Sequence, residues 1–243
     1  MSVSGRSDGV QRPKRFYKTA SAGPVEGGFA VLLDGRGPPR TPAGGRLILP
    51  TPGLADLVAA DWEAQQTEID AGRMPAMRLA ATAIDRVSAV REEVAEEVAR
   101  YAGSDLTCYR AEAPDSLVAA QAAGWDPLLA WAEEALGLRL SAVGGVIHRP
   151  QPEVSLARAR ALALEHDDFG LTGLAQAAGL FGSAVLALAL RHGRVGGQEA
   201  HDLARLDEAW QEARWGVDDE AAARTAARLE EALLLERWFA ALR

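Results

Sequence analysis

The sequence predicts an α+β fold in which a small β-rich N-terminal domain precedes a larger α-helical domain. The first 50 residues contain eight Arg or Lys and three Asp or Glu, a net charge of +5. The rest of the chain contains 18 basic and 31 acidic residues, a net charge of −13. The apolar pattern changes at the same place, from short runs between turn residues to the spacing of amphipathic helices.

We therefore divide the chain into a leader at 1–12, a β-rich domain at 13–50 and a helical domain at 51–243. The leader mixes Ser, Gly and charged residues without an apolar period, so we expect it to be disordered. It also lacks the apolar segment of a secretory signal. The single cysteine, Cys108, excludes an intramolecular disulfide and fits a reducing compartment, which we expect to be the bacterial cytoplasm.

Short extended runs predict the β-rich domain. We expect strands at Arg15–Lys18 and Phe29–Leu33, separated by the turn residues of 23–28, and an extended run at Leu47–Leu49. Asp34-Gly35 is a strong two-residue hairpin signal. Strands this short need a partner surface, so the sequence predicts a small sheet or half-barrel that leans on the helices.

Helix signals begin at residue 51. Thr51-Pro52 combines a capping hydroxyl with a proline suited to the first helical turn, and Met74-Pro75 should end that helix. A long helix is expected from about 78 to 101. Further helices are expected at about 115–136, 154–168, 172–192, 198–215 and 219–241. Leu138–Ser141 and Val146–His148 are expected to pair as a small hairpin.

The segment Leu171–Leu190 has no charged residue and is long enough to cross a membrane. It contains polar residues and three glycines, and the rest is largely Ala and Leu. Amphipathic patterns flank it on both sides. These features favour a central bundle helix, so we expect no membrane insertion.

Motifs for catalysis are missing. The sequence contains no phosphate-binding loop, dinucleotide-binding glycine motif or serine nucleophile elbow, and no two of its four histidines have helical metal-ligand spacing. Four glutamates at 92, 93, 96 and 97 could bind a metal or a partner, although a solvated helix face is the favoured interpretation. We predict no enzymatic activity, no metal and no cofactor. The acidic main body argues against nucleic acid as a ligand.

Two tryptophan-containing stretches remain. Trp62, in an acidic helical segment with Gln65, either packs against the sheet or anchors a partner, and packing is favoured. The second stretch runs from 206 to 216, with two acidic residues beside two tryptophans, and suits the rim of an interface. A weak surface pair between Arg205 and Glu208 would also explain it, and the sequence alone favours that pair.

Read in order, several motifs resemble the ATP-synthase assembly chaperones of mitochondria and alpha-proteobacteria, over about residues 13–240. They are Arg15-Phe16-Tyr17-Lys18, Leu33-Asp34-Gly35-Arg36, Thr41-Pro42-Ala43, Leu49-Pro50-Thr51, Asp61-Trp62-Glu63-Ala64-Gln65, Met74-Pro75, Thr82-Ala83-Ile84-Asp85, Tyr109-Arg110, Gln121, Trp125-Asp126-Pro127 and Leu206-Asp207-Glu208 with Trp215-Gly216. Gly37-Pro38-Pro39 departs from the family pattern and puts the local hairpin in doubt.

The resemblance implies a small β domain followed by an orthogonal α-helical bundle, without catalysis or cofactor. It implies binding of the unassembled alpha subunit of the catalytic head, which prevents aggregation before alpha pairs with beta. The family's important acidic position carries over to Asp207 or Glu208. The expected partner-binding residues are Asp207, Glu208, Trp210, Gln211, Trp215, Trp62 and Gln65. We expect a monomer in the bacterial cytoplasm, with relatives in the mitochondrial matrix.

Two other functions remain open. The chain could be a small-molecule-binding protein or enzyme that uses a pocket between the two domains, lined by Tyr109, Arg110 and His148. It could also be a structural adaptor that stays in the mature ATP synthase.

Overall fold

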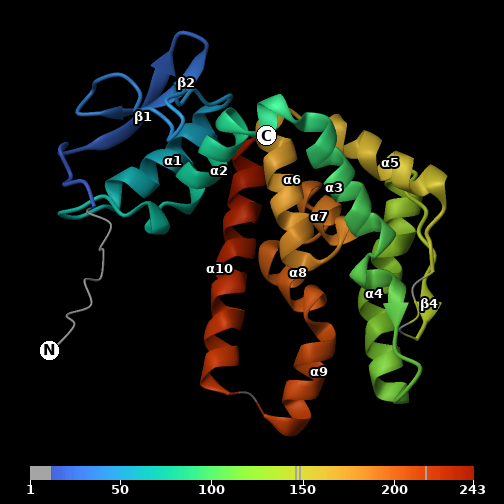
Figure 1. Cartoon of the computed structure of the whole chain (residues 1–243). Coiled ribbons are helices and arrows are strands. Elements are labelled where there is room, and N and C mark those ends of the chain that lie inside the picture. The colour runs from blue at the N-terminus through green and yellow to red at the C-terminus, as the bar shows by residue number, and fades with distance from the viewer. Residues whose placement is uncertain (1–11, 146, 148, 217) are drawn as a thin grey trace, which may run out of the picture.

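The computed structural model describes residues 12–145, 147, 149–216 and 218–243 (Figure 1). A small β part is followed by a helical bundle, as predicted. The strands are β1 (Ala20–Val25), β2 (Gly28–Leu33), β3 (Tyr109–Arg110) and β4 (Val143–Gly144). The α-helices are α1 (Pro52–Glu63), α2 (Pro75–Asp85), α3 (Arg91–Gly103), α4 (Asp115–Leu136), α5 (Glu153–Leu164), α6 (Asp168–Phe181), α7 (Ala184–Arg191), α8 (Gly197–Ala204), α9 (Leu206–Trp215) and α10 (Asp219–Ala241). Short 3-10 helices lie at Ala71–Arg73, Val87–Ala89 and Leu106–Cys108.

The first hairpin differs from the prediction. β1 pairs antiparallel with β2 from Ala20↔Leu33 to Val25↔Gly28. The predicted turn at 23–28 is therefore largely strand, and only Glu26 and Gly27 turn the chain. Pro24 is tolerated because a proline without an N–H fits the edge of a two-stranded sheet. The prediction of a strand at Arg15–Lys18 was wrong, because this segment joins the end of α1 through side-chain contacts instead.

The Asp34-Gly35 turn forms as predicted. Both residues have positive φ, +51° and +72°, and the Arg36 N–H donates to the Leu33 carbonyl at 3.0 Å. Asp34 Oδ1 accepts from the backbone N–H groups of Lys18 (2.8 Å) and Thr19 (3.0 Å). These two hydrogen bonds lower the pKa of the Asp34 carboxyl. The turn therefore ties the end of β2 to the segment that precedes β1.

The run Leu47–Leu49 pairs with the sheet at one point, where Phe29 and Leu49 exchange backbone hydrogen bonds of 2.9 and 2.8 Å. The sheet then packs on α1. Leu33, Leu49, Leu54 and Val58 belong to one continuous hydrophobic core that includes residues on both sides of position 50. The division of the chain at 50 therefore remains a proposal about folding units.

Several predicted helices are shorter than expected. Thr51 caps α1 by accepting from the Leu54 N–H at 3.1 Å, as predicted, but α1 ends at Glu63 and Met74-Pro75 begins α2 instead. The helix predicted from 78 to 101 is divided between α2 and α3. The helix predicted at 172–192 breaks at Gly182, where φ is +64°, and Ser183 caps α7. The helix predicted at 198–215 breaks at Arg205, between α8 and α9.

Helices α4 and α10 confirm the predictions for 115–136 and 219–241, and α5 begins as expected but ends at Leu164. The predicted hairpin near 144 is replaced by a parallel pairing of β3 with β4. Its expected second strand includes residues 146 and 148, which lie outside the described residues.

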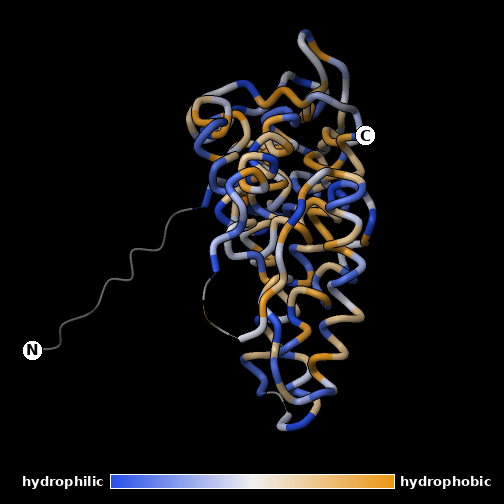
Figure 2. The backbone as a smooth tube through the Cα atoms, turned by 90° about the vertical axis from the view of Figure 1, so that its right-hand side faces the viewer, coloured by the Kyte–Doolittle hydropathy of each residue, from blue (hydrophilic) through white to orange (hydrophobic). Residues whose placement is uncertain are grey.

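The uncharged segment Leu171–Leu190 lies in the core, as predicted. Every residue of α7 from Ala184 to Leu190 is buried, and the helix contacts α3, α4, α6, α8 and α10. In Figure 2 the most hydrophobic stretches of the backbone run through the middle of the bundle. Among the described residues, none of the helices is long and apolar enough to cross a membrane.

Candidate functional site

Helix α9 holds five of the seven residues predicted to bind a partner. All ten of its residues are described, and none is buried. It contacts α4 and α8 and extends away from the compact part of the bundle (Figure 1). A helix that buries no side chain contributes little to the core, so its sequence is free to serve contact with another molecule.

Helix α4 fixes the position of α9. The Gln121 side chain is buried; its Nε2 donates to Asp207 Oδ1 at 2.7 Å, and its Oε1 accepts from the Ala111 N–H at 2.8 Å. One turn later, buried Trp125 donates from Nε1 to the Leu203 carbonyl at 3.0 Å. A Cβ at Gly124 would lie 2.9 Å from Leu203 Cδ2 and 3.1 Å from Leu206 Cδ1, so a larger residue there would have to displace these two leucine side chains.

The two adjacent acids of α9 have different surroundings. Asp207 is half-buried and accepts the hydrogen bond from Gln121, whereas Glu208 is exposed. The predicted pair between Arg205 and Glu208 was wrong. Arg205, which caps the junction of α8 and α9 and lies in neither helix, instead donates to Glu212 Oε1 at 2.6 Å. Within the described part of the chain, Glu208 forms no ion pair and remains available to a partner.

The last turns of α9 expose aromatic surface. The Arg214 guanidinium carbon lies 3.3 Å from the centroid of the Trp210 ring, and its Nη1 donates to the Trp210 carbonyl at 2.9 Å. The Trp210 and Trp215 rings meet edge to face at 6.3 Å. Trp215 is 75% exposed, and Gln211 beside it is also exposed. An exposed tryptophan among charged groups is typical of residues that anchor a protein partner.

The other two predicted residues point inward. Trp62 is buried and its ring meets Tyr17 edge to face at 5.8 Å, while the Tyr17 hydroxyl donates to the Trp62 carbonyl at 2.6 Å. Buried Gln65 donates to the Asp61 carbonyl (2.9 Å) and accepts from the Asp70 N–H (2.8 Å). The favoured packing role of Trp62 is confirmed. Neither side chain offers a surface to a partner, so direct contact by Trp62 and Gln65 is not retained.

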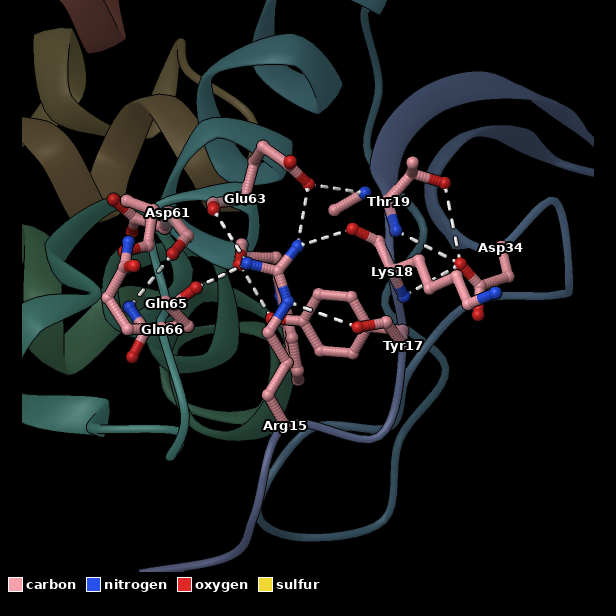
Figure 3. A network of polar contacts seen from close by, with 12 residues as sticks. Arg15, Tyr17, Lys18, Thr19, Asp34, Asp61, Glu63, Gln65 and Gln66 are labelled. Carbon is pink, nitrogen blue, oxygen red and sulfur yellow. Dashed lines mark hydrogen bonds and ion pairs between the residues drawn. The ribbon is translucent and has the colours of Figure 1, made fainter.

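Figure 3 shows how this region joins the β part to α1. Arg15 donates to the backbone carbonyls of Tyr17 (3.1 Å), Lys18 (2.7 Å), Glu63 (3.1 Å) and Gln65, and forms an ion pair of 3.1 Å with the Glu63 carboxylate. Asp61 Oδ2 accepts from the Met77 N–H at 2.8 Å, at the start of α2. Burial raises the pKa of the Asp61 carboxyl. The motif around Trp62 therefore connects the β part to α1 and α1 to α2.

The alternative pocket is only partly supported. Tyr109 and Arg110 line a cavity of about 750 Å³ together with Asp207, but it lies beside β3, β4 and α9 and not between the two domains. Arg110 is committed to Asp126 at 2.7 Å and to the Thr107 carbonyl at 2.8 Å. His148 lies outside the described residues.

The surroundings of Cys108 and of the four glutamates of α3 explain both features without a reaction or a ligand. Burial raises the pKa of the Cys108 thiol to about 12, which keeps it protonated and unreactive. Glutamates 92, 93, 96 and 97 are exposed, and Arg160 of α5 pairs with Glu92 and, at 3.6 Å, with Glu96. The predicted solvated face is confirmed. The described residues include no group of three or more His, Cys, Asp or Glu that could hold a metal ion.

Sequence reasoning missed Gln121, which holds Asp207 of α9, and Trp125, which holds Leu203 near the end of α8, just before α9. The sequence marks both residues only through the family resemblance. Their spacing of four residues on one helix, with Gly124 between them, could have predicted that they face the same neighbouring element. Five of the seven predicted partner-binding residues gather on α9, an exposed helix that packs on α4 and α8, and the other two lie buried elsewhere.

Comparisons with known proteins identify the family. Residues 14–133 match the family described as ATP12 chaperone protein. The crystal structure of Atp12 from Paracoccus denitrificans is 44% identical and superposes with a TM-score of 0.88 over 95% of this chain and 99% of that one. An Asp-to-Lys mutant of the same protein matches at 44% identity and a TM-score of 0.89, over 95% and 98%. A protein from Agrobacterium tumefaciens, titled a candidate chaperone, matches at 42% and 0.89, over 95% and 87%. The chain belongs to the ATP12 chaperone family.

Proposed function

We propose that this protein is an assembly chaperone of ATP synthase that binds the unassembled alpha subunit of the catalytic head. It acts by binding, without catalysis or cofactor, as a monomer in the bacterial cytoplasm. Family membership and the motifs quoted above support the role in assembly. The exposed surface of α9 carries the assignment of the contact.

The physical basis is the surface that an unassembled subunit exposes. A subunit that will later pair with a neighbour carries apolar area that promotes aggregation until it is covered. Helix α9 presents two tryptophan rings together with the exposed side chains of Glu208 and Gln211, a mixed apolar and acidic surface that can cover such an area. Because α9 buries none of its residues, it can bind a client without disturbing the core.

The direct test is complex formation between the purified chain and its alpha subunit, together with light scattering of the alpha subunit as it refolds. We expect a complex and suppressed scattering with the natural chain. Glu208→Lys should weaken both, because it reverses an exposed charge, unpaired among the described residues, on the helix that carries the two tryptophans. Glu97→Lys is the matched control, since Glu97 is also exposed but lies on α3.

Absence of a complex, together with unsuppressed scattering by the natural chain, would contradict the proposed function. Equal losses of binding in Glu208→Lys and Glu97→Lys would instead contradict the placement of the contact on α9, without contradicting the chaperone role.

A further inference from the structure

The β part carries basic residues that its own acids do not neutralise. Two cations near its start pair with acids of the helical part: Arg12 with Asp70 at 3.1 Å and Arg15 with Glu63 at 3.1 Å. Arg36, Arg40 and Arg46 are exposed, and within the described residues none of them forms an ion pair. These three arginines lie on the loop that follows β2.

Arg40 and Arg46 face each other across a short antiparallel bridge. The flanking residues make the backbone hydrogen bonds, from the Thr41 N–H to the Gly45 carbonyl (2.9 Å) and from the Leu47 N–H to the Pro39 carbonyl (3.4 Å). This is the pairing in which side chains of opposed residues come closest. Like charges placed directly opposite each other in this way destabilise the pair.

The loop that presents the two arginines is firmly held. Thr41 and Leu47 are buried, and the Thr41 hydroxyl donates to Asp85 Oδ1 at 2.6 Å. The Ala43 N–H donates to the other oxygen of the same carboxylate at 3.1 Å. The Gly45 N–H donates to the Thr41 hydroxyl at 2.9 Å. Packing therefore fixes the backbone that places the two arginines opposite each other, and Arg40 Nη1 donates to the Gly44 carbonyl of the same loop at 2.7 Å.

We propose that Arg40 and Arg46 form a docking point for an acidic segment of the client protein, and that they act together with α9. The inference rests on the proposed function. A carboxylate placed between the two guanidinium groups would remove their repulsion, and the fixed loop needs little ordering to bind it. The client would then contact an acidic and aromatic helix at one place and a basic loop at another.

The observations favour a protein over a nucleic acid or a membrane surface. Binding to a polyanion depends on many neutralised phosphates, whereas this surface offers two opposed arginines. The whole chain carries a net charge of −8, which repels an extended polyanion. An acidic segment of limited length avoids that repulsion.

The test compares the double variant Arg40→Gln/Arg46→Gln with the control Arg73→Gln/Arg194→Gln. The control removes the same charge from two exposed arginines elsewhere. We expect the first variant to weaken binding of the alpha subunit about three- to tenfold, with a smaller dependence on salt, while the control binds as the natural chain does. The same variant should melt within a degree or two of the natural chain at low salt, because the loss of like-charge repulsion offsets the loss of the hydrogen bond from Arg40 to the Gly44 carbonyl.

Unchanged binding in Arg40→Gln/Arg46→Gln, or an equal loss in both variants, would overturn the inference while the proposed function stands. Failure of the natural chain to bind the alpha subunit would overturn the proposed function and the inference with it. A further experiment measures binding of the natural chain and of both variants to vesicles with anionic headgroups and to duplex DNA. If Arg40→Gln/Arg46→Gln loses that binding and keeps the alpha subunit, the surface serves a polyanion and not a protein.

Discussion

Two regions of this molecule have similar sequences and opposite surroundings. The segment 61–65 and helix α9 each combine acidic residues, tryptophan and glutamine. In segment 61–65 these side chains point inward and connect the β part, α1 and α2. In α9 the Gln211 and Trp215 side chains face solvent, while Asp207 is tied to α4 through Gln121 and Arg214 through a 3.4 Å hydrogen bond to the Ser116 hydroxyl. Residue types alone therefore do not distinguish a structural motif from an exposed surface. The distinction depends on whether the helix that contains them packs those side chains against its neighbours.

The strongest expected contrast is between the two tryptophans Trp62 and Trp215. Trp62→Ala should lower the free energy of unfolding by about 3–5 kcal/mol, because it leaves a cavity between Tyr17 and the core. Trp215→Ala should change it by less than about 0.5 kcal/mol, since that ring is largely exposed. Urea titration followed by circular dichroism measures both values, and similar losses in the two variants would break the comparison.

Trp62→Phe sharpens the same contrast. The Trp62 Nε1–H is buried and has no hydrogen-bond partner among the described residues, so its loss removes no hydrogen bond. The aromatic ring that packs on Tyr17 is retained. We expect Trp62→Phe to cost less than half of what Trp62→Ala costs in the same titration.

The glutamines Gln65 and Gln121 should give the next largest effect. Gln65→Ala leaves the buried Asp70 N–H without its acceptor and should cost about 1–3 kcal/mol of stability. Gln121→Ala should cost a similar amount and should also loosen α9, because its amide bridges Ala111 and Asp207. Hydrogen exchange should therefore speed up along α9 in Gln121→Ala and not in Gln65→Ala. Equal exchange along α9 in the two variants would remove Gln121 from its positioning role.

A smaller effect is expected from pH. Burial, with a contribution from Arg191, lowers the pKa of His166 from 6.5 to about 4. The unfolded chain therefore binds a proton at higher pH than the folded one, so the free energy of unfolding should fall as the pH falls from about 6.5 towards 4. After allowance for partial exposure, we expect a loss of about 1–2 kcal/mol that His166→Gln reduces. Thermal melts across this pH range measure it, and an identical pH dependence in the variant would exclude His166 as the source.

Local chemistry predicted much of the fold. The Thr51 cap, the Asp34-Gly35 turn and the extents of α4 and α10 follow from signals within a few residues of each. The breaks at Gly182 and Arg205 were missed, because the apolar period continues through both. The strand expected at Arg15–Lys18 failed for a different reason: Arg15 is held by carbonyl groups about 50 residues away in sequence, which no local pattern reveals.

The site was predicted less evenly. The exposed position of α9 agrees with the interface assigned to it from the sequence, whereas Gln65, also expected to bind a partner, is buried. The sequence also left open which of Asp207 and Glu208 is available. The hydrogen bond from Gln121 to Asp207 separates them, and it joins residues 86 positions apart.

Hydrogen exchange of the chain alone and in complex with the alpha subunit tests the central claim most directly. The account predicts that amides of α9 become protected in the complex, while those of segment 61–65 exchange at the same rate in both states. Protection of segment 61–65 without any change in α9 would contradict it.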